Sequence, residues 1–162
     1  MIATASVEPA RAADLAPVLD LLAAASLPRE GVGEHFAGFL VARAGGEVVG
    51  AVGQERYGDA VLLRSLVVAP THRGRGLGQA LVAGLLAEAR RSGARRVFLL
   101  TETAADFFAG LGFARTTRAE AEPAVGASLE LTHGMSAVRG LHVPGARRRP
   151  APSRLTPCRG VC

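Results

Sequence analysis

The segment at residues 67–78, VVAPTHRGRGLG, carries the clearest chemistry in this sequence. An apolar run that ends at Val68 leads into a glycine-rich turn, and the turn leads into an amphipathic helix beginning at Gly76. Backbone N–H groups at a helix start have no partner inside the helix, and the helix dipole adds partial positive charge there. Glycines let an anion approach the backbone, and Arg73 adds a charged, forked donor. The spacing predicts an anion-binding loop; the alternative is a structural turn whose glycines are incidental.

Two common phosphate-binding patterns do not fit this loop. A P-loop requires Gly-Lys followed by Ser or Thr, and the dinucleotide fingerprint requires a glycine where the chain has Gln79. The residues present are Arg-x-x-Gly-x-Gly, as Arg73, Gly76 and Gly78, after a Val-x-Pro strand end. In this form the segment resembles the acetyl-CoA pyrophosphate loop of the GNAT N-acetyltransferase superfamily.

The elements around the loop must position it, and their order can be read from apolar periodicity and turn residues. Pro123 and Gly126 interrupt a weak pattern, and residues 128–132 fit either a last strand or part of a helix. The pattern predicts strands at 2–7, 39–42, 47–55, 60–68 and 97–100 and from 113, with helices from Leu15, at 76–91 and at 104–110; Asp14 is placed to cap the first helix.

This order of elements resembles a whole GNAT domain over residues 2–118. The resemblance implies an α/β (α+β) fold with a mixed central sheet of about six to seven strands flanked by helices. Dimers are common in the superfamily, so a homodimer is compatible with the resemblance, and the oligomeric state stays open.

Charge is unevenly distributed along the 162 residues. The formal net charge is +5, but residues 1–138 hold 13 arginines against 14 acidic residues. Residues 139–162 hold six arginines, no acidic residue and four of the nine prolines. We therefore expect an acetyltransferase domain at 1–138 followed by a basic, flexible tail at 139–162. Nucleic acid is not an expected partner of the domain; binding through the three arginines at 147–149 is the alternative.

The remaining composition bears on location and metals. No run of 18 apolar residues is present, and the first residues lack a basic start followed by an apolar stretch, so we expect a cytoplasmic protein without a membrane partner. Cys158, Cys162 and His142 are too widely spread for a recognisable metal site, so no metal is expected.

A narrower likeness appears in residues 39–42, 62–68 and 99–108, which resemble the arsenic-resistance-associated branch of GNAT enzymes. That branch ends in a Cys-Pro-Ser-Ala-like segment, whereas here residues 136–138 have no cysteine before them. The likeness implies transfer of an acetyl group to a small amine in arsenic or toxin resistance. The alternatives are a protein or amino-acid N-acetyltransferase, and a sensor that binds acyl-CoA without turnover.

The resemblance also assigns residues to acetyl-CoA, the expected co-substrate. The thioester carbonyl would bind a backbone N–H of the 60–68 strand, and the pyrophosphate would bind the glycine-rich loop. The pantetheine arm would run between the strands at 60–68 and 97–100, which splay apart in this superfamily. The assigned residues are Leu66, Val67 and Val68 on the strand; Arg73, Gly74, Arg75, Gly76, Leu77 and Gly78 in the loop; and Thr101, Phe107 and Phe108 on the opposite wall.

Two carboxylates are candidates for removing the proton of the amine. Glu55, at a strand end, is the first candidate and would act through water; its alternative is a solvated strand-end charge. Glu102 follows the 97–100 strand and is the second; its alternative is a charge favoured by a helix start. Many GNAT enzymes have a tyrosine at the position of Phe108, where it protonates the leaving thiolate, and phenylalanine cannot do so.

Three residues are candidates for binding the acceptor. Arg64 interrupts an apolar strand, so it either binds an anionic acceptor group or forms an ion pair with Glu55 or Glu47 across the hairpin. Tyr57 either lines the acceptor site or is a hairpin aromatic. His35 lies where acceptor loops are found, with simple solvent exposure as its alternative, and we expect His72 to face solvent.

Overall fold

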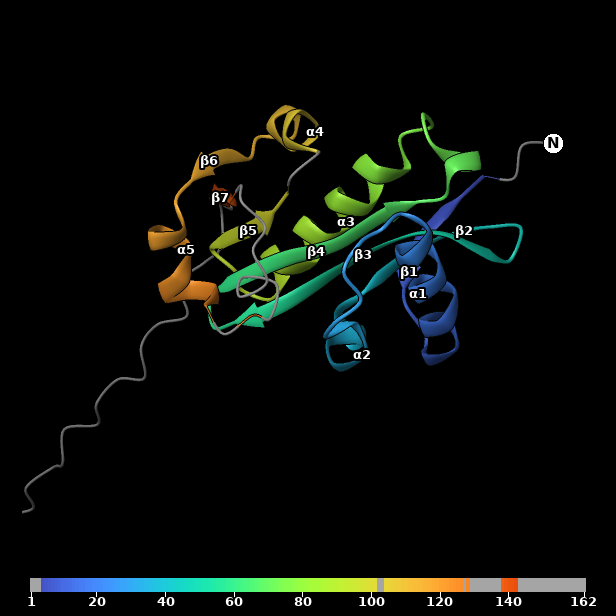
Figure 1. The fold of residues 1–162 in the computed structure, drawn as a ribbon, viewed down its shortest axis with the longest axis horizontal. Helices are drawn as coiled ribbons and strands as arrows, with labels where there is room; N and C mark the ends of the chain where they lie inside the picture. Colours follow the sequence, from blue (N-terminus) through green and yellow to red (C-terminus); the bar gives the residue numbers. More distant parts are fainter. Residues whose placement is uncertain (1–3, 102–103, 127, 129–137, 143–162) are drawn as a thin grey trace, which may run out of the picture.

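The computed structural model describes residues 4–101, 104–126, 128 and 138–142. Its centre is one seven-stranded sheet with the order β1-β2-β3-β4-β5-β7-β6 (Figure 1). Only the β4–β5 pair is parallel among the strand pairs of this part of the chain. The mixed sheet predicted from the sequence is thereby confirmed. The strands are β1 (Ser6–Pro9), β2 (Leu40–Ala44), β3 (Glu47–Tyr57), β4 (Ala60–Val68), β5 (Arg96–Leu100), β6 (Ala114–Thr116) and β7 (Val138–His142).

Helices cover both faces of the sheet (Figure 1). One face carries α1 (Leu15–Ala24), α2 (Val32–His35) and α5 (Arg118–Val125), and the other carries α3 (Leu77–Arg91) and α4 (Ala105–Gly110). Within the described residues, no helix has the length and apolar character needed to cross a membrane.

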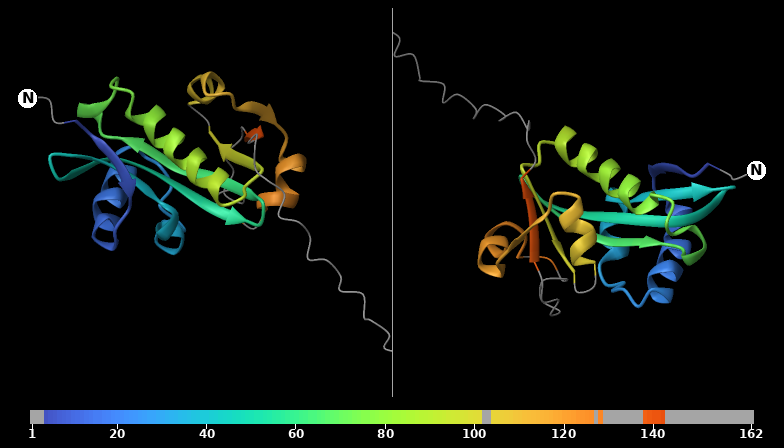
Figure 2. Two further views of the ribbon diagram at one scale, coloured as in Figure 1. Left: turned by 180° about the vertical axis from the view of Figure 1, so that it is seen from behind. Right: turned by 90° about the horizontal axis from the view of Figure 1, so that it is seen from above.

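Helix α3 is the longest of the described helices and lies along the central strands in both views of Figure 2. Its buried positions, Leu81, Val82, Leu85 and Ala89, recur at three- and four-residue spacing. Such spacing places them on one helical face, and burying each leucine contributes about 1.5–3 kcal/mol. Packing of this face on β3 and β4 fixes the start of α3 beside the end of β4.

The sequence prediction placed most elements, and its errors lie near the ends of the chain. The predicted strand at 2–7 is β1 at Ser6–Pro9. Helix α5 was not predicted, because Pro123 lies inside it. Most of residues 128–132, and all of 143–162, fall outside the described part of the chain.

Strand β7 crosses the predicted domain boundary at residue 138. It pairs antiparallel with β5 from Arg96↔His142 to Leu100↔Val138, and with β6 on its other side. The sheet therefore continues to residue 142, four residues into the segment expected to be a flexible tail. The sequence pattern did not predict β7 because its pairing partners lie 22–46 residues earlier in the chain, and short strands carry little local signal.

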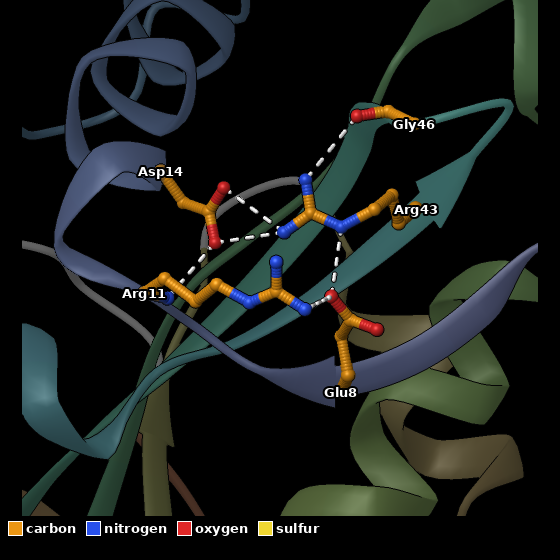
Figure 3. Close-up of polar contacts among 5 residues, drawn as sticks. All are labelled: Glu8, Arg11, Asp14, Arg43 and Gly46. Atoms are coloured by element: carbon orange, nitrogen blue, oxygen red, sulfur yellow. Dashed lines mark hydrogen bonds and ion pairs between the residues drawn. The ribbon is translucent and has the colours of Figure 1, made fainter.

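Asp14 does not cap α1 as predicted. Its carboxylate accepts the Arg11 N–H at 2.8 Å and Nη2 of Arg43 at 2.9 and 3.0 Å, while Nε of Arg43 donates to Glu8 at 2.7 Å (Figure 3). Burial alone raises the pKa of Asp14, but the hydrogen bonds from Arg11 and Arg43 outweigh it and hold that pKa below its ordinary value. The carboxylate thus caps the short 3₁₀ turn at Ala12–Asp14 and joins it to β1 and β2, but gives α1 itself no side-chain cap.

Gly53 is a position where β3 requires the absence of a side chain. A Cβ there would lie 2.2 Å from the Phe39 ring, which is 1% exposed. We expect Gly53→Ala to lower the free energy of unfolding by about 1–3 kcal/mol, because the buried ring must move. Urea denaturation measures this. Gly33→Ala is the matched control, since its new methyl would meet nothing within 4 Å; an equal loss in both variants would contradict the contact.

Candidate active site

A cavity of about 1070 Å³ opens where β4 and β5 separate. The paired register of these strands runs from Ala60↔Arg96 to Leu63↔Leu99, while β4 continues to Val68. The lining comes from both strands, from the start of α3 and from α4 on one face, and from the loop after α1 on the other. The cavity therefore reaches both faces of the sheet at the point where the strands part.

The glycine-rich loop forms one end of the cavity. Gly74 and Gly76 have φ of +74° and +77°, a left-handed conformation that favours glycine. The first four N–H groups of a helix lack intrahelical partners. In α3 these belong to Gly76, Leu77, Gly78 and Gln79, and all four residues line the cavity. Arg73 lines it too, and its Nε donates to the Val68 carbonyl at 3.0 Å. The loop thus presents backbone donors and a guanidinium to the cavity, as an anion site requires.

Strand β4 is bulged where it lines the cavity. Ser65 and Leu66 together face Val52 of β3, since the register passes from Gly53↔Arg64 to Ala51↔Val67. Ser65 has φ of +57°, a left-handed conformation that is uncommon for a residue with a side chain. A bulge of this kind leaves one residue outside the regular ladder and re-aims its neighbours. The half of β4 that would receive the thioester carbonyl is therefore irregular and open to the cavity.

The opposite wall is aromatic. Phe107 and Phe108 meet edge to face with ring centroids 5.1 Å apart, and Phe108 meets Phe113 at 5.6 Å. Oγ1 of Thr101 accepts the Ala104 N–H at 3.0 Å just before α4, which holds this wall in place. The wall gives this side of the cavity an apolar surface.

A buried ionic network adjoins the cavity at Arg64. Glu55 is 1% exposed and Arg64 is 2% exposed, and Nη1 of Arg64 donates to Oε1 of Glu55. The Tyr57 hydroxyl donates to Oε2 at 2.5 Å, and Nη2 of Arg64 donates to the Glu30 carbonyl at 2.5 Å. His35 lies beside this pair, its Nε2 3.9 Å from Oε1 of Glu55. The network ties β3 and β4 to the loop that precedes α2.

The electrostatics of the network keep Glu55 charged. Burial alone raises the pKa of Glu55, but hydrogen bonds from Tyr57, Ser128 and Arg64 outweigh it and hold that pKa below its ordinary value. Burial, together with the hydrogen bond to Glu55, raises the pKa of Tyr57 to about 12. At neutral pH the carboxylate is ionised, the phenol is protonated, and Glu55 is a weaker proton acceptor than an ordinary glutamate.

The structure brings most of the predicted site residues together. All of the predicted cofactor residues except Arg75, which is exposed, line the cavity. Arg64 also lines it, whereas Glu55, Tyr57 and His35 belong to the network and are not among the lining residues. Arg64 forms the ion pair with Glu55 that was the alternative to an anion-binding role.

The other residues singled out in the sequence are Glu102, His142, the two cysteines and His72. Glu102 and the side chains of His142, Cys158 and Cys162 lie outside the described residues. His72, expected to face solvent, is partly exposed in the short 3₁₀ turn at Pro70–His72 and is among the residues that line the open cavity.

Sequence reasoning missed Gln79 and the loop after α1, residues 25–28, which also line the cavity. Helical numbering alone would have found Gln79, since it is the third residue of α3. The loop after α1 carries no comparable signal, because its contact with β4 arises only on folding.

Acidification should separate the contribution of Glu55 from those of other groups. A carboxyl whose pKa is lower in the folded chain stabilises it above the unfolded pKa, about 4.3, and this stabilisation is lost as pH falls through the folded value. We expect the gap in unfolding free energy between wild type and Glu55→Gln to be largest above the unfolded pKa and to narrow as pH falls below it. Urea titrations on both sides of this pKa measure it, and a constant gap would show that Glu55 is not held ionised.

Comparisons with known proteins agree with this geometry. The family model for the acetyltransferase (GNAT) family matches residues 8–113. Staphylococcus aureus GNAT-family acetyltransferase superposes with a TM-score of 0.75 at 13% identity, covering 86% of this chain and 99% of that one. The Mycobacterium tuberculosis protein Rv2747, solved with CoA and NLQ, superposes with a TM-score of 0.70 at 23% identity. The match covers 85% of this chain and 98% of that one. No curated protein matches the chain.

Neisseria gonorrhoeae N-acetylglutamate synthase, solved with CoA and L-arginine, gives a TM-score of 0.73 at 21% identity. The match covers 88% of this chain but only 34% of the synthase, so the chain spans about a third of that protein's length. At these identities the solved structures establish the fold, while the family model covers more than half of the chain. The cavity between parted strands, the anion loop and the family match agree: the chain belongs to the GNAT acetyltransferase family.

Proposed function

We propose that this protein transfers the acetyl group of acetyl-CoA to the amine of a small molecule. The observation that carries the proposal is that the free N–H groups at the start of α3 and the bulged half of β4 open into one cavity. A phosphate-bearing co-substrate bound at the loop would place its far end near the bulge. The solved neighbours with CoA support the same co-substrate.

Different residues along the cavity bind different parts of acetyl-CoA. The N–H groups of Gly76–Gln79 and the Arg73 guanidinium bind the pyrophosphate. The aromatic wall and β4 hold the pantetheine arm, and a backbone N–H of residues 66–68 accepts the carbonyl oxygen. Acetyl-CoA supplies an activated thioester, and the amine attacks its carbonyl carbon directly, with expulsion of CoA as the thiolate.

Glu55 suits a positioning role better than that of a base. Its pKa is lowered and both carboxylate oxygens accept hydrogen bonds, so it holds Arg64 against β4 and the loop before α2. The amine then loses its proton to water in the cavity, and Glu102 remains the second candidate base.

The acceptor lies toward residues 25–28 and Arg64, on the face opposite α3. The sequence resemblance to the arsenic-resistance-associated branch favours a small toxic amine, including an organoarsenical amino acid, over a protein N-terminus. A sensor that binds acyl-CoA without turnover is the second candidate, and Phe108 favours it, since its ring has no proton to donate to a thiolate.

Calorimetric titration of acetyl-CoA into the full chain tests the proposal, followed by a free-thiol release assay. The acceptor panel contains amines, amino acids and organoarsenicals. Binding with amine-dependent thiol release supports an acetyltransferase and identifies its acceptor class. Binding without release for every acceptor favours the sensor, and absence of binding overturns both.

Arg73→Ala tests the phosphate end of the cavity. We expect it to weaken acetyl-CoA binding about tenfold, because one charged hydrogen-bonding group is lost. Arg90→Ala is the matched control: it removes a guanidinium from the exposed, opposite end of the same helix. Calorimetry on both variants gives the comparison, and equal affinities would place the phosphates elsewhere.

A further inference from the structure

Ser65 stands out within the cavity because its backbone conformation favours glycine, yet it carries a hydroxyl. Its φ is +57°, and it lies in the bulge of β4 rather than in a turn. The other described non-glycine residue with positive φ, Ser26, has a structural reason for it. Ser26 follows the C-terminus of α1, where its N–H bonds the Ala23 carbonyl and the next N–H bonds that of Leu22, a helix-capping arrangement.

The hydroxyl of Ser65 can donate a hydrogen bond into the cavity. Nε of Arg64 donates to its Oγ at 3.2 Å, so the oxygen already accepts from a buried cation. Among the described residues, no acceptor takes the hydroxyl proton. A hydroxyl that accepts from a guanidinium becomes a stronger donor, because hydrogen bonds in a chain polarise one another. The proton is thus available to a group in the cavity.

The other hydroxyl groups that line the cavity are placed less well. Thr101 accepts the Ala104 N–H and belongs to the turn before α4. Ser26 lies on the loop after α1, and Phe107 and Phe108 on the facing wall have no polar atom. Ser65 immediately precedes residues 66–68, whose backbone N–H would receive the carbonyl. A second donor adjacent to the first is the arrangement that stabilises an oxyanion.

We propose that Ser65 is a second oxyanion donor, a catalytic residue of the transferase reaction; this inference rests on the proposed function. As the amine nitrogen bonds to the carbonyl carbon, the C=O π electrons move to the oxygen. That oxygen accepts hydrogen bonds from the Ser65 hydroxyl and the backbone N–H. The C=O then re-forms, the C–S bond breaks with its electron pair leaving on sulfur, and the proton lost by nitrogen passes to water. Ser65 keeps its own proton throughout.

Infrared difference spectroscopy of bound acetyl-CoA, labelled with ¹³C at the carbonyl, tests this without any acceptor. Hydrogen bonding lowers the carbonyl stretching frequency. We expect the band in wild type to lie below that of free acetyl-CoA and to move back toward it in Ser65→Ala. Ser26→Ala, with the same residue type and the same backbone conformation in the same cavity, should give the wild-type band.

Turnover separates a chemical role from a structural one. Ser65→Ala and Ser65→Gly should both lower kcat roughly 100-fold with the best acceptor, while acetyl-CoA affinity changes less than about twofold. Glycine relieves the backbone strain, so recovery of kcat in Ser65→Gly alone would show that only the conformation matters and would overturn the proposal. Bound acetyl-CoA with unchanged bands in both variants would also overturn it. Failure of wild type to bind acetyl-CoA would instead overturn the proposed function, and this inference with it.

Discussion

A glutamate in place of Gln79 should weaken acetyl-CoA binding roughly 50-fold while stabilising the fold. Gln79 is the third residue of α3 and lines the phosphate end of the cavity. If the pyrophosphate binds as proposed, the added carboxylate would lie near two negative phosphates, and at an effective dielectric constant between those of protein and water the repulsion would amount to about 2–3 kcal/mol. The same charge in the first turn of a helix stabilises it by about 0.3–1 kcal/mol.

In Gln79→Glu the expected changes in acetyl-CoA affinity and in stability have opposite signs, which distinguishes a local effect from misfolding. A variant that lost affinity by misfolding would lose stability as well, whereas Gln79→Glu should lose affinity and gain stability. Gln79→Lys is the matched control: it should bind acetyl-CoA at least as tightly as wild type and be slightly less stable. Calorimetry and urea denaturation on the three proteins measure both quantities, and equal affinities in all three would place the pyrophosphate away from α3.

Breaking the buried pair of Glu55 and Arg64 should cost about 3–5 kcal/mol of unfolding free energy in either single variant. Both side chains are at most 1% exposed, so Glu55→Gln leaves a guanidinium, and Arg64→Met leaves a carboxylate, without its main opposite charge. The double variant removes both charges together. We expect it to be more stable than the sum of the single losses predicts, by about 2 kcal/mol or more.

The exposed pair of Glu88 and Arg91 provides the control for this cycle. Its side chains are 45% and 74% exposed, so Glu88→Gln should change stability by less than about 0.5 kcal/mol. Urea denaturation of the five proteins measures the cycle. Additive single losses would show that Glu55 and Arg64 are not coupled, and Glu55 would then again be a candidate base.

The sequence determined the central elements because their signals are local. Residues 60–68 form a nearly continuous apolar run and are β4 with the predicted bounds, and the leucine spacing after Gly76 predicts the helix observed as α3. The loop between them was recognised from Arg73, the glycine spacing and the strand and helix on either side, and Gly74 and Gly76 adopt the positive φ that glycine permits. An anion site at a helix start needs only neighbouring residues, so one segment of sequence specifies it.

What the tertiary structure decided depends on contacts between distant residues. Arg64 lies nine positions from Glu55 and 34 from the carbonyl of Glu30, and only folding shows that the arginine is part of an ion pair. The bulge that turns Ser65 into the cavity arises from the register between β3 and β4. Strand β7 belongs to the sheet because it pairs with β5 on one side and β6 on the other. The sequence therefore determined the fold family and the glycine-rich turn before α3, while the contacts of Glu55, Arg64 and Ser65 depend on strand pairing and burial.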